Sequence, residues 1–287
     1  MAYGGIASPI EETPTLNAVI TLTTDFGLSG PFVAEMKGVI LGINPAAQMV
    51  DISHDIHPHQ IEEGAFVLAA AWPYFPPGSI HIAVVDPGVG GNRKSIALST
   101  PRGVFVGPDN GILAAALPDS IRRSGQVRLP RGYRAVAISE PRFLHEPVSA
   151  TFHGRDVFAP VAAHISLGTS LEALGRPAST VTALPPSRAV RMADGNLSGR
   201  VIHIDRFGNL ITNIEERDID AGRTVVEVMG NQLDRLSRTY GESSGLMALI
   251  GSSGFLEIAV NQGSAARLLG AEIGTPVTVL IRTEARE

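Results

Sequence analysis

Apolar and polar residues alternate in a regular order over residues 18–183. Short apolar runs predict buried strands at 19–22, 49–52 and 80–85, with further strands at 95–99 and 104–106. From Phe32 to Ile43, apolar side chains recur every three or four residues, which predicts one amphipathic helix. This order predicts an α/β N-terminal domain with a mixed or parallel sheet and flanking helices.

The pattern changes after about residue 183. Helical periodicity fades there, and short strand-like runs follow at 199–204, 224–229, 247–250, 255–260 and 276–281. Several short strands at close spacing predict a small all-β, barrel-like C-terminal domain. The Pro-rich stretch from Leu184 and the turn at Asp194-Gly195 separate the two patterns. We therefore expect an N-terminal extension at 1–16, the α/β domain at 17–187, a linker at 188–196 and the barrel-like domain at 197–287.

The composition limits which side chains can take part in catalysis and which classes of ligand the protein can bind. The 287 residues are 44% hydrophobic and 18% charged, which is typical of a folded globular protein. The chain has no cysteine, so disulfides, thiolate metal sites and a cysteine nucleophile are excluded. Lys37 and Lys94 are the only lysines, which leaves Asp, Glu, His, Ser, Thr, Tyr and Arg for most chemistry. A net charge of −5 gives no basic surface for nucleic acid or an anionic membrane, so we expect a small-molecule ligand.

The sequence also bears on location. Residues 1–16 lack the basic segment and continuous apolar run of a secretory signal. The longest apolar runs fall short of the roughly 20 residues that span a bilayer. We expect a cytoplasmic protein without a transmembrane segment.

A glycine-rich loop follows the apolar run at 80–85 and reads Asp86-Pro87-Gly88-Val89-Gly90-Gly91-Asn92-Arg93. Ligands bind at the carboxyl ends of strands in α/β sheets, and glycines let the backbone approach them closely. Asp86 and Arg93 are therefore candidate functional residues. The alternative is a surface turn begun by Asp86. The loop matches neither a P-loop nor a dinucleotide fingerprint, because Arg93 stands where each needs a glycine.

Residues 51–59 hold three histidines and two aspartates and suggest a second chemistry. A metal-dependent hydrolase would use His54, Asp55, His57 and His59 as ligands. No second cluster of histidines and carboxylates elsewhere in the sequence completes a metal shell. The alternative is a loop of solvated or hydrogen-bonded histidines.

Six short motifs follow one another after about Asn17. They are Thr23-Thr24-Asp25-Phe26-Gly27, Asp51-Ile52-Ser53-His54, Val85-Asp86-Pro87-Gly88-Val89-Gly90 with Arg93, Thr151-Phe152-His153-Gly154-Arg155-Asp156, Asp205-Arg206-Phe207-Gly208-Asn209, and Gly251-Ser252-Ser253-Gly254-Phe255-Leu256-Glu257 to Asn261. Each motif is weak alone. In this order and spacing they resemble the adenosine-forming S-adenosyl-L-methionine hydrolases, or SAM hydroxide adenosyltransferases, which are relatives of fluorinase and chlorinase.

The resemblance implies a homotrimer with active sites between one subunit's N-terminal domain and a neighbour's C-terminal domain. S-adenosyl-L-methionine is then the substrate, adenosine and methionine are the products, and no cofactor, nucleic acid or membrane takes part. Substrate-binding roles pass by motif to Asp25 for the ribose hydroxyls, Phe207 and Asn209 for adenine, and Asp205, Ser252, Glu257 and Val260 for the methionine end. The implied water-activating residues are Asp86, Arg93 and His153.

The chemistry of the implied substrate fits this small set. A sulfonium is an activated leaving group, so attack at C5′ lacks only a good nucleophile. Arg93 can stabilise a developing hydroxide, while Asp86 or His153 accepts the proton, and the sequence leaves that choice open.

The halogenating relatives differ at the nucleophile. They carry a serine at the position of Gly154 and an aromatic residue at that of Asp86. A carboxylate repels halide, so we predict hydrolysis. Ser253 stands where those relatives carry an arginine near the methionine end. The alternatives are a SAM-dependent halide adenosyltransferase, the metal-dependent hydrolase above, and a non-catalytic SAM- or adenosine-binding module.

Overall fold

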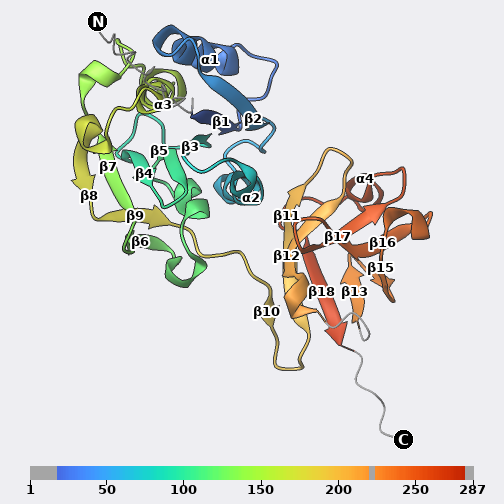
Figure 1. The fold of residues 1–287 in the computed structure, drawn as a ribbon. Helices are drawn as coiled ribbons and strands as arrows, with labels where there is room; N and C mark the ends of the chain where they lie inside the picture. The colour runs from blue at the N-terminus through green and yellow to red at the C-terminus, as the bar shows by residue number, and fades with distance from the viewer. Residues whose placement is uncertain (1–17, 220–223, 282–287) are drawn as a thin grey trace, which may run out of the picture.

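Two sheets, each with its own hydrophobic core, organise the chain (Figure 1). The computed structural model describes residues 18–219 and 224–281. The predicted extension at 1–16 therefore lies outside the described residues. The α/β domain and the following barrel-like all-β domain confirm the predicted fold class.

The N-terminal sheet has seven strands in the order β2-β1-β3-β5-β4-β7-β8. The four strands β2, β1, β3 and β5 run parallel, whereas β4, β7 and β8 join antiparallel, so the sheet is mixed. The bounds are β1 (Val19–Thr24), β2 (Gln48–Ser53), β3 (Ser79–Val84), β4 (Ser95–Ser99), β5 (Gly103–Pro108), β7 (Arg134–Ile138) and β8 (Gly175–Ala178).

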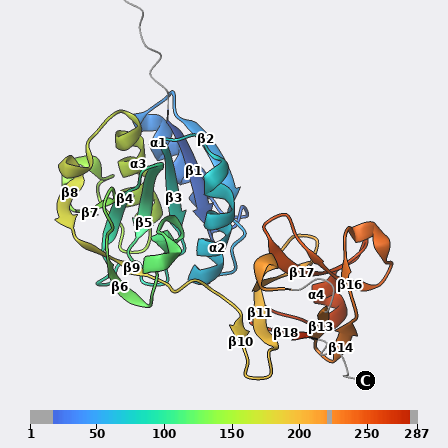
Figure 2. The same cartoon turned by 60° about the horizontal axis from the view of Figure 1, so that its bottom comes forward.

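Helices cover both faces of this sheet (Figure 2). Side chains alternate along β3, so Ile82 and Val84 pack toward α1 (Phe32–Ile43) and α3 (Ala159–Ser166). Ala83 faces the opposite core under α2 (Ile61–Ala71) and the 3₁₀ turn η2 (Ile112–Ala116). The predicted helix from Phe32 to Ile43 is confirmed, and Val33, Met36 and Ile40 of its apolar stripe are buried.

The C-terminal sheet curves into a nearly closed barrel with the path β14-β13-β18-β11-β12-β17-β16-β15, and β10 pairs with β11. Its strands are β10 (Val190–Arg191), β11 (Leu197–Ile204), β12 (Leu210–Glu215), β13 (Thr224–Val228), β14 (Asn231–Leu233), β15 (Leu236–Ser237), β16 (Leu246–Ile250), β17 (Phe255–Val260) and β18 (Pro276–Ile281). The short helix α4 (Ala265–Leu269) packs against it. Apolar side chains of the strands fill the interior.

A small ribbon and several short turns complete the described chain. β6 (Gly125–Arg128) pairs with β9 (Thr180–Ala183), after which residues 184–189 lead to the second sheet (Figure 1). The remaining turns are η1 (Trp72–Tyr74), η3 (Asp119–Ile121), η4 (Pro141–Phe143), η5 (Gly154–Phe158), η6 (Leu171–Leu174), η7 (Glu216–Asp218) and η8 (Tyr240–Glu242). None of the helices in the described ranges is long and apolar enough to cross a membrane. The predicted linker at 188–196 stays a prediction.

Candidate active site

Asp25 and Asp86 follow two neighbouring parallel strands. The register of β1 and β3 pairs Thr24 with Val84, so the residues after both strands emerge at one edge of the sheet. Both aspartates line a pocket of about 290 Å³, together with Phe26, Phe32, Pro58 and His59. The backbone N–H of His59 donates to Oδ2 of Asp25 at 2.9 Å, which orients that carboxylate.

Gly90 lets the loop after β3 reach the segment that carries His153. Its φ of 73° lies in the left-handed region that favours glycine. A Cβ atom at this position would overlap the backbone carbonyl oxygen of Ala150. The glycine therefore permits a close approach of two loops that lie far apart in the sequence.

Asp86, Arg93 and His153 form one hydrogen-bonded cluster. The guanidinium of Arg93 contacts both carboxylate oxygens of Asp86, with Nε 3.0 Å from each and Nη2 closer still to Oδ2. Nη1 donates to the Ser95 hydroxyl at 2.8 Å. The side chains of Asp86 and Arg93 are 4% and 11% exposed, so water screens this pair little. The structure thus brings together all three predicted water-activating residues.

The contact between Arg93 and His153 fixes the ring tautomer. Nη2 of Arg93 lies 2.7 Å from Nδ1 of His153, and a guanidinium can only donate. Nδ1 therefore accepts and carries no proton. Burial, and then the charge of Arg93, lower the pKa of His153, although Asp86 and Asp156 oppose the shift. A neutral ring with Nδ1 unprotonated holds its proton on Nε2, which makes that atom a donor.

A π-helical turn, η5, places His153 at its start. Asp156 is fully buried within this turn and accepts hydrogen bonds from Arg155 Nε at 2.6 Å and from the Ser149 backbone N–H at 2.8 Å. Burial alone would raise the pKa of Asp156, but these hydrogen bonds outweigh it and lower the pKa. Asp156 therefore stays ionised and stabilises the turn. The motif around His153 thus contains a charged residue with a structural role beside the candidate for the chemistry.

The second predicted group lies in the C-terminal domain. Oδ1 of Asp205 accepts the backbone N–H groups of Phe207 and Asn209, each at 2.9 Å, and Oδ2 accepts the Asn209 amide at 2.9 Å. Asp205 thereby holds its own turn. The Phe207 side chain stands out from the turn at 77% exposure. All three line a pocket of about 710 Å³ with Val260 and Tyr240.

Tyr240 is a residue of this pocket that sequence reasoning missed. Its hydroxyl donates to Oε2 of Glu257 at 2.8 Å, and Glu257 itself is buried. Burial raises the pKa of Glu257, and the charge of Asp205 adds to the rise. Burial and the Glu257 contact raise the pKa of Tyr240 to about 12. The phenol, not Glu257, faces the pocket, and no motif around Tyr240 in the sequence signals this.

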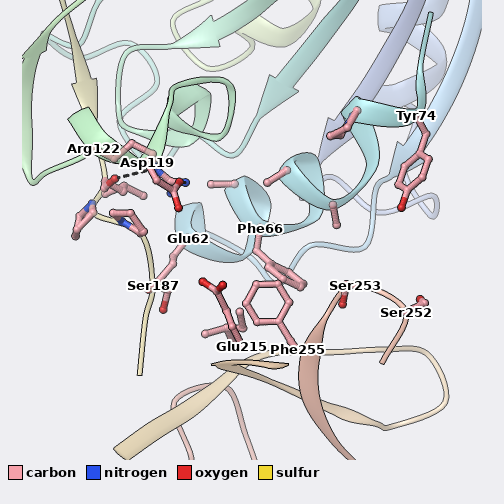
Figure 3. Close-up of a pocket in the computed structure, with 18 residues that line it drawn as sticks. Glu62, Phe66, Tyr74, Asp119, Arg122, Ser187, Glu215, Ser252, Ser253 and Phe255 are labelled. Carbon is pink, nitrogen blue, oxygen red and sulfur yellow. Dashed lines mark hydrogen bonds and ion pairs between the residues drawn. The ribbon is translucent and has the colours of Figure 1, made fainter. Parts of the chain in front are cut away.

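Ser252 lies elsewhere. It lines a cavity of about 380 Å³ between α2 and the C-terminal sheet, beside Ser253, Phe66 and Phe255 (Figure 3). Within one chain, Ser252 therefore does not share a pocket with Asp205, Phe207 and Asn209. The pocket of Asp25 and Asp86 likewise shares no lining residue with that of Asp205.

The histidine run after β2 separates into different contacts. His54 is buried and bonds through Nδ1 to the Thr24 hydroxyl at 2.8 Å. His57 turns to Glu63, with Nδ1 3.0 Å from Oε2, whereas His59 contributes its backbone to Asp25. Over residues 18–219 and 224–281, the structure shows no group of three or more His, Cys, Asp or Glu that could hold a metal ion. The metal-ligand prediction thus finds no assembled cluster there.

Solved structures share this fold. An uncharacterized conserved protein from Thermotoga maritima superposes with a TM-score of 0.80 at 33% identity, covering 91% of this chain and 99% of the other. A conserved hypothetical protein from Thermus thermophilus gives a TM-score of 0.71 at 37% identity, covering 92% of this chain and all of the other.

Sequence comparisons identify relatives along nearly the whole length. An (R)-S-adenosyl-L-methionine hydrolase from Thermus thermophilus is 41% identical over 90% of this chain and 97% of its own. The hydrolase of the same name from Salinispora tropica is 39% identical, covering 91% and 97%. A fluorinase from Nocardia brasiliensis is 27% identical, covering 92% and 97%.

Family models match both domains. The SAM hydroxide adenosyltransferase N-terminal domain matches residues 20–175, and the C-terminal domain of the same family matches residues 199–278. These two segments correspond to the two sheets of the structure. The chain belongs to the SAM hydroxide adenosyltransferase family.

Proposed function

We propose that this protein hydrolyses S-adenosyl-L-methionine to adenosine and L-methionine. The observation that carries the proposal is the cluster of Asp86, Arg93 and His153 beside the Asp25 pocket, in a chain of this family. Relatives 37–41% identical are named (R)-S-adenosyl-L-methionine hydrolase, which supports the same substrate here. The reaction uses water and the sulfonium substrate, and no cofactor.

In the proposed reaction, the oxygen of water attacks C5′ and the C5′–S bond breaks. The bonding electron pair goes to sulfur, which leaves as the neutral thioether of methionine. One proton must leave the attacking water. Holding water, C5′ and sulfur in line lowers the barrier through orientation.

We assign the proton to Asp86. The tautomer of His153 leaves a donor at Nε2, so this ring cannot take a proton there while Nδ1 accepts from Arg93. A carboxylate keeps free lone pairs even when an arginine contacts both oxygens. Asp86 also lines the pocket. Arg93 stabilises the developing hydroxide, and His153 orients the water by donating from Nε2.

The substrate roles rest on the family motifs and on the two pockets. Asp25 suits a vicinal diol, because a carboxylate accepts two hydrogen bonds at once. Phe207 offers an exposed ring for stacking on adenine, and Asn209 an amide for its edge. Glu257 supports this pocket through Tyr240. Asp205 and Val260, which line this pocket, are the proposed contacts of the methionine end, whereas Ser252 lines the separate cavity beside α2 and has that role only as an expectation from the family motif.

A second copy of the chain completes each site in this proposal. Asp25 and Asp86 line one pocket and Phe207 and Asn209 another, with no lining residue in common. Packing of one copy's N-terminal pocket against a neighbour's C-terminal pocket would join them and cover the Phe207 ring. A head-to-tail contact with a threefold rotation closes into a ring, which is the homotrimer that the family resemblance implies. A cytoplasmic location remains a prediction.

Two features of the region where the nucleophile would bind favour hydrolysis over halide transfer. Asp86 places a carboxylate at the pocket, and this charge repels an anion. A Cβ atom at Gly154 would lie 3.0 Å from the Phe152 ring and 3.2 Å from both the Met36 sulfur and the Phe26 ring. A serine like that of the halogenating relatives would therefore be crowded here.

The test is turnover of each sulfonium epimer by the purified protein. We expect release of adenosine and methionine in equal amounts from the (R) epimer, with slower or no release from the (S) epimer. A protein that binds adenosine but turns over neither epimer would be a binding module. Production of a 5′-halo nucleoside in place of adenosine would instead establish a halide transferase.

A further inference from the structure

Glu63 is a buried carboxylate that the proposed reaction does not use. It lies in the first turn of α2 and is 1% exposed. Its partners come from two sides: His57 in the N-terminal domain and His203 in the C-terminal domain. Burial alone would raise the pKa of Glu63, but the hydrogen bonds from His203 and His57 outweigh it and lower the pKa. The group is therefore an ionised acceptor between the two domains.

The first contact leads to the pocket of Asp25. Oε2 of Glu63 accepts the backbone N–H of His57 at 2.8 Å, and the His57 ring lies 3.0 Å from the same oxygen. Two residues later, the backbone N–H of His59 donates to the Asp25 carboxylate. His59 has a φ of 69°, a conformation that a non-glycine residue keeps only where its surroundings hold it.

The second contact leads to the adenine side. Oε1 of Glu63 lies 2.6 Å from Nδ1 of His203, and β11 ends one residue later, directly before Asp205. Phe66, one turn along α2, packs on the His203 ring with centroids 5.9 Å apart. It also packs on Phe255, at 5.5 Å between centroids (Figure 3). This aromatic contact seats β11 and β17 against the same helix that carries Glu63.

We propose that Glu63 is a positioning residue that keeps the Asp25 pocket and the Asp205–Asn209 turn in a fixed relation within each chain. The inference rests on the proposed function, because that function gives each of the two surfaces a role in binding a nucleoside. In a ring of copies, the two surfaces of one chain serve two neighbouring sites. The orientation that Glu63 sets would then decide whether each surface meets its counterpart.

The adjacent Glu62 provides a matched control. It also bonds across the domain boundary, to Arg200 at 2.6 Å, but both side chains are more than 40% exposed. Both of these side-chain hydrogen bonds go to Arg200 rather than to the segment from His57 to His59. A general loosening of the boundary would affect both variants, whereas the proposed role belongs to Glu63 alone.

The test measures binding of adenosine and of 2′,3′-dideoxyadenosine by calorimetry. The ratio of the two dissociation constants reports the diol contact of Asp25. In Glu63→Gln we expect this preference for the diol to fall by about tenfold. In Glu62→Gln it should stay within about twofold of the wild-type value, as for an exposed ion pair. The KM for S-adenosyl-L-methionine should rise in the first variant more than kcat falls.

A second variant changes the partner of Glu63 in the C-terminal domain and leaves the domain that contains Asp25 unaltered. His203→Leu fills a similar volume but removes the C-terminal hydrogen bond, and we expect the same direction of change in the diol preference. Circular dichroism confirms that each variant is folded. A wild-type preference in both folded variants would overturn the positioning role and leave the proposed hydrolysis intact. A wild-type protein that shows no diol preference would overturn the Asp25 assignment on which both proposals depend.

Discussion

The two halves of the candidate site differ in how complete they are within one chain. In the N-terminal half, buried charges are paired, and the cluster of Asp86, Arg93 and His153 is assembled. In the C-terminal half, the Asp205 turn is held rigidly, but the Phe207 ring projects into solvent. In the proposed site, the N-terminal half is thus preorganised, whereas the C-terminal half presents an aromatic side chain that is 77% exposed.

This difference has a physical reason. A charged cluster must be desolvated and paired before substrate arrives, since reorganising it during the reaction would add to the barrier. A stacking surface needs no such preparation, because it gains its energy when the ligand or a neighbouring copy covers it. In the proposed assembly, the exposed Phe207 ring is the surface that the nucleoside and the neighbouring copy cover.

The largest effect should come from the assembled half. In Asp86→Asn, the side chain keeps its shape but loses its capacity to accept the proton, so we expect kcat to fall by about 10²–10⁴. Adenosine affinity should stay near the wild-type value, since Asp25 and the adenine side are unchanged. Turnover and calorimetry check this. A variant with wild-type kcat would remove Asp86 from the mechanism.

A smaller effect tests whether the two halves of a site come from different copies. Asp86→Asn damages only the N-terminal half and Phe207→Ala only the C-terminal half. If the two impaired variants are mixed, unfolded and refolded together, random assembly gives about a quarter of the sites two intact halves. Activity should then recover to about a quarter of the wild-type value. Mixtures no more active than either variant alone would place both halves of a site in one chain.

The smallest effect is a pH dependence of the assembled half. The folded-state pKa of His153 lies below the ordinary value of 6.5, so the neutral ring persists above that pH. As pH falls below 6.5, protonation of Nδ1 opposes the Arg93 contact and the folded state binds the proton less readily than the unfolded chain. Stability and kcat/KM should both decline on this acid side. An acid limb of kcat/KM with its midpoint above 6.5 would contradict a neutral, Arg93-bound His153.

Much of the fold could be predicted where the apolar pattern was regular. The helix from Phe32 to Ile43 and the strand-like runs at 19–22 and 80–85 are confirmed. The apolar pattern does not predict the strand β12, because the buried polar residues Thr212 and Asn213 interrupt it. The buried Thr212 hydroxyl donates a hydrogen bond to the Leu256 carbonyl at 2.8 Å. This contact forms only in the folded sheet.

The residues of the candidate site also fall into two groups, those that sequence motifs predict and those that depend on contacts formed only in the fold. Motifs identified Asp86, Arg93 and His153, and the structure brings them together. Tyr240 lies in a stretch without a motif, and its role depends on the distant Glu257. The contact between Glu63 and His203 joins residues 140 positions apart, so it depends on how the two domains pack rather than on any local pattern.

The origin of the 5′-oxygen of adenosine shows directly whether water attacks C5′. Turnover in ¹⁸O-labelled water, followed by mass spectrometry of both products, reports where water attacks. Attack at C5′ places one ¹⁸O atom in the 5′-hydroxyl of adenosine and none in methionine. Adenosine without the label would contradict attack of water at C5′ and, with it, the role assigned to Asp86, Arg93 and His153.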